Sequence, residues 1–383
     1  MRFIHTADWH LGKNLKGISL LDEQNFLLNG EFLKLADDWK PDAIIIAGDI
    51  YDRGVPPIDA VDLFDEIIFK LSEKKIPLLC ISGNHDNSSR LNFASRLLTQ
   101  AKFFITTKIT ENPAPIILED KFGEIYFSLI PYFPFAEFRE TFSAENFDEN
   151  FDINAANKFY IAQCRKKIPA NKRSVAVAHL FASGGITSES ERKFAGGEEN
   201  ISAENFSAYN YTALGHLHKP QNMKKTNFVV RYSGSPLKYS FDEVKHDKGV
   251  TLVEIDGEGN VSYEHQKLSP KKDLKVVEGK VEELQNFSRT EDYIFANLTD
   301  KKYVLNAVDK LRNSAFPNIL GINFTNLERG SENFTHKDKF QNNASPLEDF
   351  AEFYKETVGE DLSAENKKIM QDFLTELENK LND

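Results

Sequence analysis

Residues 43–54 read AIIIAGDIYDRG, and this stretch decides how the chain folds. An apolar run that contains three consecutive isoleucines is followed at once by Gly48 and Asp49. A short run of this kind is typical of a buried parallel strand, which would present the Asp49 carboxylate at its carboxyl end. Ligands of open α/β sheets bind in the crevice outside these ends. The stretch therefore predicts an α/β fold with a polar site at the end of this strand.

The same pattern, an apolar run followed by polar side chains, occurs four more times. The runs that begin at residues 2, 78, 175 and 211 lead into Asp8 and His10, into Asn84 and His85, into His179, and into His216 and His218. Five of the nine histidines of the chain lie in these motifs. Carboxylate, imidazole and amide oxygen are metal ligands, and imidazole favours manganese, iron or zinc over magnesium. The motifs therefore predict a metal site at one rim of the fold.

The spacing of these side chains favours two ions rather than one. In extended backbone residues i and i+2 point to the same side, so Asp8 and His10 can hold one ion together, as can His216 and His218. Asp49 has two carboxylate oxygens and can bridge two ions. Two divalent cations roughly 3.5 to 4 Å apart can share a hydroxide and place it in line with a phosphorus atom. We therefore expect phosphoester hydrolysis.

Further side chains beside these motifs are candidates for other roles. His85 can donate a proton to the leaving oxygen, with Asp86 orienting its ring; the alternative for His85 is a structural hydrogen bond. Arg53 and Arg90 can contact a phosphate or form internal salt bridges. A basic cluster at residues 165–173 is either a solvated helix end or a surface that follows phosphates beside the site.

The pattern of elements divides the chain into four parts. Strands and helices alternate through residues 1–268, and a small α+β unit without ligand-type clusters follows at residues 269–327. Residues 328–345 are polar and predict a linker. Residues 346–383 hold two amphipathic helices, which predict a hairpin whose apolar face packs on the body or docks on a partner helix.

The composition excludes several classes of protein. The chain has 383 residues and a formal net charge of -12, which argues against binding nucleic acid by bulk attraction alone. Two cysteines, Cys80 and Cys164, exclude a disulfide framework. The first expected strand begins at Arg2, which leaves no room for a signal peptide, and no run approaches the ~18 apolar residues of a membrane helix. We expect a cytoplasmic protein.

The motifs, taken in order, resemble those of the calcineurin-like metallophosphoesterase superfamily. They are Asp8-x-His10, Gly48-Asp49-x-x-Asp52-Arg53, Gly83-Asn84-His85-Asp86, His179 and Gly215-His216-x-His218. Longer strings are similar to the nuclease branch of that superfamily, the bacterial relatives of the eukaryotic double-strand-break repair nuclease. These strings include HTADWHLG at residues 5–12, GNHDNSSRL at 83–91 and ALGHLHKPQ at 213–221.

The resemblance implies a two-sheet metallophosphoesterase sandwich flanked by helices, with a small DNA-capping domain and a C-terminal helical hairpin. It implies two divalent ions, most simply Mn²⁺, one held by Asp8, His10, Asp49 and His218 and the other by Asp49, Asn84, His179 and His216. The implied activity is that of a double-strand exonuclease and single-strand or hairpin endonuclease in DNA repair and recombination. The implied partners are a second copy of the chain and an SbcC-like SMC-type ATPase. Some relatives have a second histidine at the position of Asp52, so the role of Asp52 stays open.

Two other functions remain alternatives. Residues 48–54, GDIYDRG, are close to the signature of phosphoprotein phosphatases, which hydrolyse phosphomonoesters. The other alternative is a non-catalytic scaffold that binds DNA ends and keeps the metal site only for its shape. Activity on a phosphopeptide but not on DNA would favour the phosphatase, and a His85 variant with unchanged cleavage would favour the scaffold.

Overall fold

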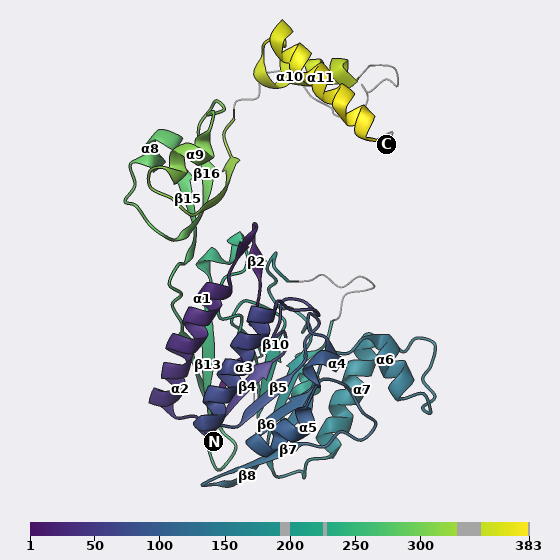
Figure 1. Cartoon of the computed structure of the whole chain (residues 1–383). Helices are drawn as coiled ribbons and strands as arrows, with labels where there is room; N and C mark the ends of the chain where they lie inside the picture. Colours follow the sequence, from purple (N-terminus) through teal and green to yellow (C-terminus); the bar gives the residue numbers. More distant parts are fainter. Residues whose placement is uncertain (192–199, 225–227, 328–345, 382–383) are drawn as a thin grey trace. The chain divides into compact units, whose positions relative to one another are not determined.

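The computed structural model describes residues 1–191, 200–224, 228–327 and 346–381 (Figure 1). The chain forms two compact units, residues 1–327 and residues 328–383, and each is described by itself. The prediction of a linker at residues 328–345 lies outside the described residues. In the described part of the chain, no helix is both long enough and apolar enough to cross a membrane.

The first sheet of the larger unit contains three of the five strands that lead to the predicted site. Its order is β14 (Val261–Lys267), β13 (Gly249–Ile255), β1 (Arg2–Thr6), β4 (Ala43–Ala47), β5 (Leu78–Ile81) and β6 (Phe103–Thr106). The four strands from β1 to β6 in this order are parallel, and β13 runs antiparallel to β1. The carboxyl ends of β1, β4 and β5 therefore meet at one edge of the sheet.

The second sheet contains the other two strands. Its order is β11 (Gln221–Lys224), β12 (Val229–Tyr232), β10 (Tyr211–Gly215), β9 (Arg173–His179), β8 (Gly123–Ile130) and β7 (Ile116–Asp120). The four central strands are parallel, and the edge strands β11 and β7 are antiparallel to their neighbours. β9 and β10 are buried along their whole length, which explains why they read as continuous apolar runs.

The two sheets pack face to face, and the predicted sandwich is confirmed. One apolar cluster joins Phe3 and Ile45 of the first sheet to Phe127, Val177 and Tyr211 of the second. Alternate residues of β4 point the other way, so that Ile44 and Ile46 belong to the core beneath the outer helices. Both faces of each central strand are therefore buried.

Helices cover both outer faces (Figure 1). On the first sheet these are α1 (Leu21–Phe26), the π-helix η1 (Leu27–Phe32), α2 (Leu33–Trp39) and α3 (Ile58–Glu73), and on the second they are α6 (Phe135–Thr141) and α7 (Ile153–Lys166). The shorter elements are β2 (Asn14–Leu15), β3 (Ile18–Ser19), α4 (Ser88–Leu91), α5 (Ser95–Leu98), η2 (Thr99–Ala101), η3 (Ala203–Phe206) and η4 (Phe241–Lys245).

A third sheet follows the sandwich. It consists of the parallel strands β15 (Leu274–Gly279), β16 (Tyr293–Leu298) and β17 (Ile319–Phe324), connected by α8 (Val281–Gln285) and α9 (Ala307–Arg312). It has its own small core, which includes Ile294, Leu298 and Leu311. Leu274 and Tyr293 belong instead to the core of the first sheet, and they attach this part to the sandwich.

The second unit is a pair of helices, α10 (Pro346–Val358) and α11 (Ala364–Leu381). Phe350 and Tyr354 lie one turn apart on α10, half-buried, with ring centroids 6.4 Å apart. On α11, Ile369 and Phe373 are exposed. The hairpin thus covers part of its apolar surface and leaves part uncovered.

Candidate metal centre

Four of the seven predicted ligands meet at the ends of β1, β4 and β10. The Nε2 atoms of His10 and His218 lie 3.1 Å apart, and His10 Nε2 lies 3.6 Å from Asp49 Oδ2. Asp8 joins His10 and His218 in one group of mutually close ligand atoms. All four side chains are at most 2% exposed. The first predicted set of ligands therefore converges on one buried point.

The other predicted ligands also meet next to Asp49. Asn84 Oδ1 lies 2.9 Å from His179 Nε2 and 3.3 Å from His216 Nδ1. His179 Nε2 also lies 3.5 Å from Asp49 Oδ2, the oxygen that faces His10. Asp49 is thus the side chain shared by the two sets, as expected for a bridging carboxylate.

The backbone that brings these residues together differs from the extended conformation assumed from the sequence. Asp8 and His10 have φ values of 54° and 45°, and Asp49 and His216 have φ values of 51° and 108°. The argument from i, i+2 alternation is therefore wrong for Asp8 and His10, although the two side chains do converge. Left-handed conformations of non-glycine residues cost of order 1–3 kcal/mol and cluster at functional sites.

Two glycines make room for this arrangement. A Cβ atom on Gly48 would lie 2.3 Å from Nδ1 of His179, and one on Gly83 would lie 2.1 Å from Oδ1 of Asp49. Gly48 also has a φ of 90°, which side chains disfavour. The glycine before Asp49 and the glycine before Asn84 are therefore required by the packing of the site.

Burial sets the protonation of the imidazoles. It lowers the pKa of His10 and of His218, and it lowers the pKa of His216 to about 3. Burial also lowers the pKa of His179, but the Asp49 charge and hydrogen bond outweigh it and raise that pKa to about 9. Burial alone would raise the pKa of Asp49, yet the neighbouring His179 and His10 hold it well below its usual range. Three imidazoles are therefore neutral, which is the state that binds metals.

The side chains fit a pair of divalent cations. Two buried imidazoles present Nε2 atoms to each other at 3.1 Å, and within the described residues His10 Nδ1 has no hydrogen-bond partner. Nδ1 of His179 donates to the main-chain oxygen of Ala47 at 2.8 Å, which leaves Nε2 as the ligand atom. Two carboxylates, four imidazoles and an amide oxygen form the donor set expected for manganese, iron or zinc.

The seven predicted ligands together form what we call the cage, and His85 lies at its edge. Its Nε2 is 4.0 Å from Asp49 Oδ2, and its ring meets the His10 ring edge-on at a centroid distance of 4.5 Å. Nδ1 donates to the main-chain oxygen of Asp52 at 2.8 Å. The expectation that Asp86 orients this ring is therefore wrong, because the ring is oriented by Asp52.

Asp86 acts on the backbone instead. Its carboxylate accepts hydrogen bonds from the main-chain N–H groups of Ile50, Tyr51 and Gly83. It thus ties the loop after β4 to the loop after β5. Because these two loops carry Asp49, Asn84 and His85, Asp86 fixes their relative positions.

The Asp52 side chain has a separate set of contacts. Its Oδ1 lies 3.6 Å from Nδ1 of His10 and 2.8 Å from Nζ of Lys13. The main chain of Asp52 thus orients the His85 ring, and its side chain approaches the predicted ligand His10. Arg53 and Arg90 are both exposed, and neither forms an ion pair with any described residue.

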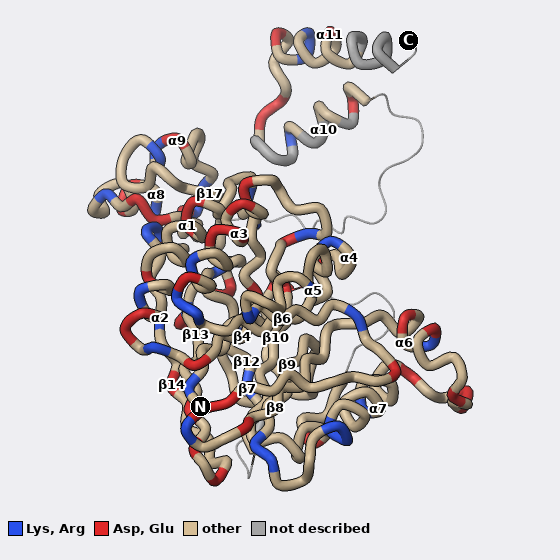
Figure 2. Tube along the Cα trace, turned by 60° about the horizontal axis from the view of Figure 1, so that its bottom comes forward, with Lys and Arg blue, Asp and Glu red and all other residues tan. Residues whose placement is uncertain are grey.

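The basic cluster at residues 165–173 lies at the wrong end of β9 to serve the site. β9 begins at Arg173 and ends at His179, a separation of roughly 20 Å at 3.3 Å per residue. Arg173 is bound to Asp120, Lys172 to Glu124, and Arg165 donates to three main-chain oxygens. The basic segment at the end of α7, blue in Figure 2, therefore lies away from the predicted ligands, and three of its five basic side chains are bound within the fold.

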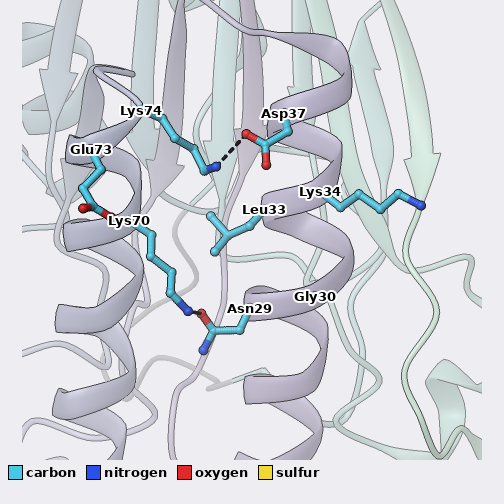
Figure 3. A pocket seen from close by; sticks show the side chains of 8 residues that line it. All are labelled: Asn29, Gly30, Leu33, Lys34, Asp37, Lys70, Glu73 and Lys74. Atoms are coloured by element: carbon cyan, nitrogen blue, oxygen red, sulfur yellow. Dashed lines mark hydrogen bonds and ion pairs between the residues drawn. The ribbon is translucent and has the colours of Figure 1, made fainter.

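A hollow between α2 and α3 is also unrelated to the cage (Figure 3). It has a volume of about 620 Å³. Two of its lysines are already paired, Lys70 with Asn29 at 2.9 Å and Lys74 with Asp37 at 2.6 Å, and Lys34 points away from α3. The hollow therefore offers no cluster of uncompensated charge to a phosphate.

Three side chains around His218 were not predicted from the sequence. Glu191 accepts the main-chain N–H of His218 at 2.7 Å, and Ser190 Oγ lies 2.6 Å from its Nδ1. Glu243, on η4, lies 3.3 Å from the same Nδ1. Ser190 and Glu191 belong to the long Gly, Ser and Glu-rich loop after His179, whose length was the one available signal, because long loops in compact domains are usually functional.

Residues 1–220 match the family model of the calcineurin-like phosphoesterases. The match includes every strand that leads to the cage, and all seven predicted ligands lie within it. The fold and the site thus define the class of the protein, a hydrolase of phosphoester bonds.

Within that class the chain is similar to named bacterial proteins over nearly its whole length. It is 34% identical over 373 residues to the SbcD subunit of nuclease SbcCD from Staphylococcus epidermidis, and the match covers 95% of each chain. It is 32% identical over 386 residues to the same subunit from Staphylococcus saprophyticus, and that match covers 98% of each chain. The chain therefore belongs to the SbcD family of nucleases.

The comparison with solved structures gives a weaker result. GAP50, the anchor in the inner membrane complex of Plasmodium, is 16% identical with a TM-score of 0.41, and the match covers 85% of this chain and 97% of that chain. A similarity at this level does not define a shared fold.

Proposed function

We propose that the protein is a manganese-dependent DNA nuclease that cleaves duplex ends as an exonuclease and single strands or hairpins as an endonuclease. The observation that carries this proposal is the two-sided cage around Asp49. Asp8, His10, Asp49 and His218 would hold one ion, and Asp49, Asn84, His179 and His216 the other. Membership of the SbcD family supports DNA as the substrate in place of a phosphoprotein.

The residues of the cage have distinct tasks in this reaction. Bound divalent cations would supply Lewis acidity and lower the pKa of a water molecule. Asp49 and Asp8 would balance part of that charge, and His10, His216 and His218, whose pKa values are lowered by burial, would supply neutral nitrogen ligands. His85 Nδ1 donates its proton to the main-chain oxygen of Asp52, so in the doubly protonated imidazolium the proton on Nε2 is the one that passes to the leaving oxygen, and the ring is left neutral.

We also assign roles in DNA binding and partner binding to residues outside the cage. We propose that residues 269–327 form a DNA-capping domain and that Arg53 and Arg90, exposed beside the His85 loop, contact phosphates. Residues 346–383 would bind an SbcC-like SMC-type ATPase. Since the relatives are bacterial and DNA is the substrate, we expect the protein to act in the cytoplasm during repair and recombination.

One experiment separates this proposal from its alternatives. Purified protein would be incubated with end-labelled duplex DNA, hairpin DNA or a phosphopeptide, with Mn²⁺ or EDTA, and with or without the ATPase and ATP. We expect cleavage of DNA only with Mn²⁺. Release of phosphate from the peptide without DNA cleavage would favour the phosphatase, and intact substrates throughout would favour the scaffold.

Replacing His85 with asparagine should slow DNA cleavage by about 10²- to 10⁴-fold, the range typical of a lost general acid. Manganese binding should be unchanged, because His85 lies outside both proposed sets of ligands. Single-turnover cleavage and calorimetric titration with MnCl₂ measure the two effects separately. A variant that loses both together would identify His85 as a ligand, and one that loses neither would remove it from the reaction.

We propose that the chain forms a homodimer, and exposed apolar side chains support this proposal. Val55 and Ile58 at the start of α3, and Phe93 and Leu97 around α4 and α5, are between 64% and 83% exposed. The two segments adjoin, since a Cβ atom on Gly54 would lie 3.5 Å from Cβ of Asn87. Strongly exposed apolar groups on adjoining segments indicate a protein interface.

Ile58→Asp and Phe93→Asp should therefore convert a dimer into a monomer, because each places a charge where a second copy would bury an apolar side chain. Multi-angle light scattering at matched concentrations measures the mass. Ile117→Asp, an exposed isoleucine on edge strand β7, is the matched control and should leave the mass unchanged. A wild-type chain that is monomeric at all concentrations would contradict the proposal.

A further inference from the structure

The residues behind His218 form a chain of hydrogen bonds that ends on a buried ion pair. His218 Nδ1 lies 2.6 Å from Ser190 Oγ, and the Ser190 hydroxyl donates to Oε1 of Glu243. Because that hydroxyl proton is used on Glu243, Ser190 Oγ is the acceptor of the proton on Nδ1. The His218 ring therefore carries its proton on Nδ1, and the Nε2 lone pair faces His10.

Glu243 is held in place from its other side. Its Oε2 lies 2.5 Å from Nζ of Lys248 and accepts the main-chain N–H of Tyr239 at 3.2 Å. Glu243 is 0% exposed and Lys248 is 3% exposed, so the pair lies fully inside the protein. Lys248 also donates to the main-chain oxygen of His218 at 2.7 Å. The carboxylate that ends the chain of hydrogen bonds is therefore fixed and charged.

The same region also holds the main chain of His218. Glu191 accepts its N–H at 2.7 Å, so both the main chain and the ring of this residue are bound by residues 190 and 191 and by η4. When one ring nitrogen of a ligand histidine donates to a carboxylate, directly or through a hydroxyl group, the tautomer of the ring is fixed and the other nitrogen becomes a more basic ligand atom. The fold itself does not require the buried Glu243–Lys248 ion pair, because apolar side chains could fill the same space without the desolvation free energy of buried charges.

We propose that Ser190 and Glu243 are positioning residues, a serine–carboxylate relay that fixes the tautomer and orientation of His218 and so sets the affinity of one of the two metal sites. The proposal rests on the metal centre proposed above and deepens it. It assigns a role to part of the long loop after His179 and to η4, which the reaction itself does not use.

The test combines metal binding with a measurement that needs no metal. Calorimetric titration of the full chain with MnCl₂ should resolve two ions in the wild type. Ser190→Ala and Glu243→Gln should raise the dissociation constant of one ion by about 10- to 100-fold and leave the other unchanged. Ser190→Thr, which keeps the hydroxyl, and Glu264→Gln, the same change at an exposed position of β14, should bind as the wild type does.

Nitrogen-15 NMR of the metal-free protein reports the tautomer directly, with His218→Asn used for assignment. We expect the proton on Nδ1 of His218 in the wild type and a mixture of tautomers in Ser190→Ala. Ser190→Ala leaves the Glu243–Lys248 pair intact, so it carries the test if Glu243→Gln does not fold. Unchanged tautomer and unchanged affinity in Ser190→Ala would overturn the relay. A wild type that binds no manganese would instead overturn the proposed metal centre, while the NMR result would still decide the relay.

Discussion

Replacing Asp49 with asparagine should abolish manganese-dependent DNA cleavage, with a loss of at least about 10³-fold. Asp49 Oδ2 lies 3.6 Å from His10 Nε2 and 3.5 Å from His179 Nε2, so it is the side chain that both proposed ion sites share. Losing the bridging charge removes several kcal/mol of stabilisation, and each 1.36 kcal/mol is a factor of ten in rate. Single-turnover cleavage of end-labelled DNA measures the loss, and manganese titration should show fewer than two ions bound.

Asparagine is the sharper substitution because it changes the charge and little else. Asparagine tolerates the φ of 51° at this position. Its side-chain oxygen can still accept the hydrogen bond from the main-chain N–H of His85, which Asp49 Oδ1 accepts at 2.8 Å. Asp62→Asn, the same change at an exposed position of α3, is the matched control and should cleave normally. Two manganese ions and cleavage within tenfold of the wild type in Asp49→Asn would contradict a bridging role.

The strands and the ligand types could be predicted because both leave strong local signals. A fully buried strand such as β4 has no solvent side, so its sequence is a continuous apolar run, and the residue after its glycine must lie at the rim. In the same way, His179 is the last residue of β9 and His216 directly follows β10. The sequence does not show that these two strands belong to a different sheet from β4.

The contacts around the ligands could not be predicted, because they depend on segments far apart in the chain. Asp86 seemed the natural partner of His85 by sequence, but its oxygens are occupied by main-chain N–H groups at Ile50, Tyr51 and Gly83. Glu243 reaches His218 from a short 3₁₀-helix 25 residues further on. An isolated glutamate in a polar turn has no pattern that separates it from a solvated one.

Ending the chain at residue 340 should abolish co-purification with the SbcC-like ATPase and leave manganese-dependent cleavage of single-stranded DNA intact. Residues 1–327 form a compact unit that contains the whole cage, so the nuclease site does not depend on the hairpin. In the hairpin, Ile369 and Phe373 lie one helical turn apart on α11 and are 62% and 54% exposed. Such a pair is a typical anchor of a helix that docks in an apolar groove.

A point substitution separates docking from a general effect of truncation. Ile369→Asp should reduce recovery of the ATPase in a pull-down from co-expressing cells, since it places a charge on the proposed contact face. Lys368→Asp introduces the same carboxylate at the neighbouring exposed position and should leave recovery unchanged. If the truncated chain still recovers the ATPase at wild-type levels, the binding surface lies in residues 1–340. Loss of single-strand cleavage on truncation would instead mean that the hairpin contributes to the nuclease site.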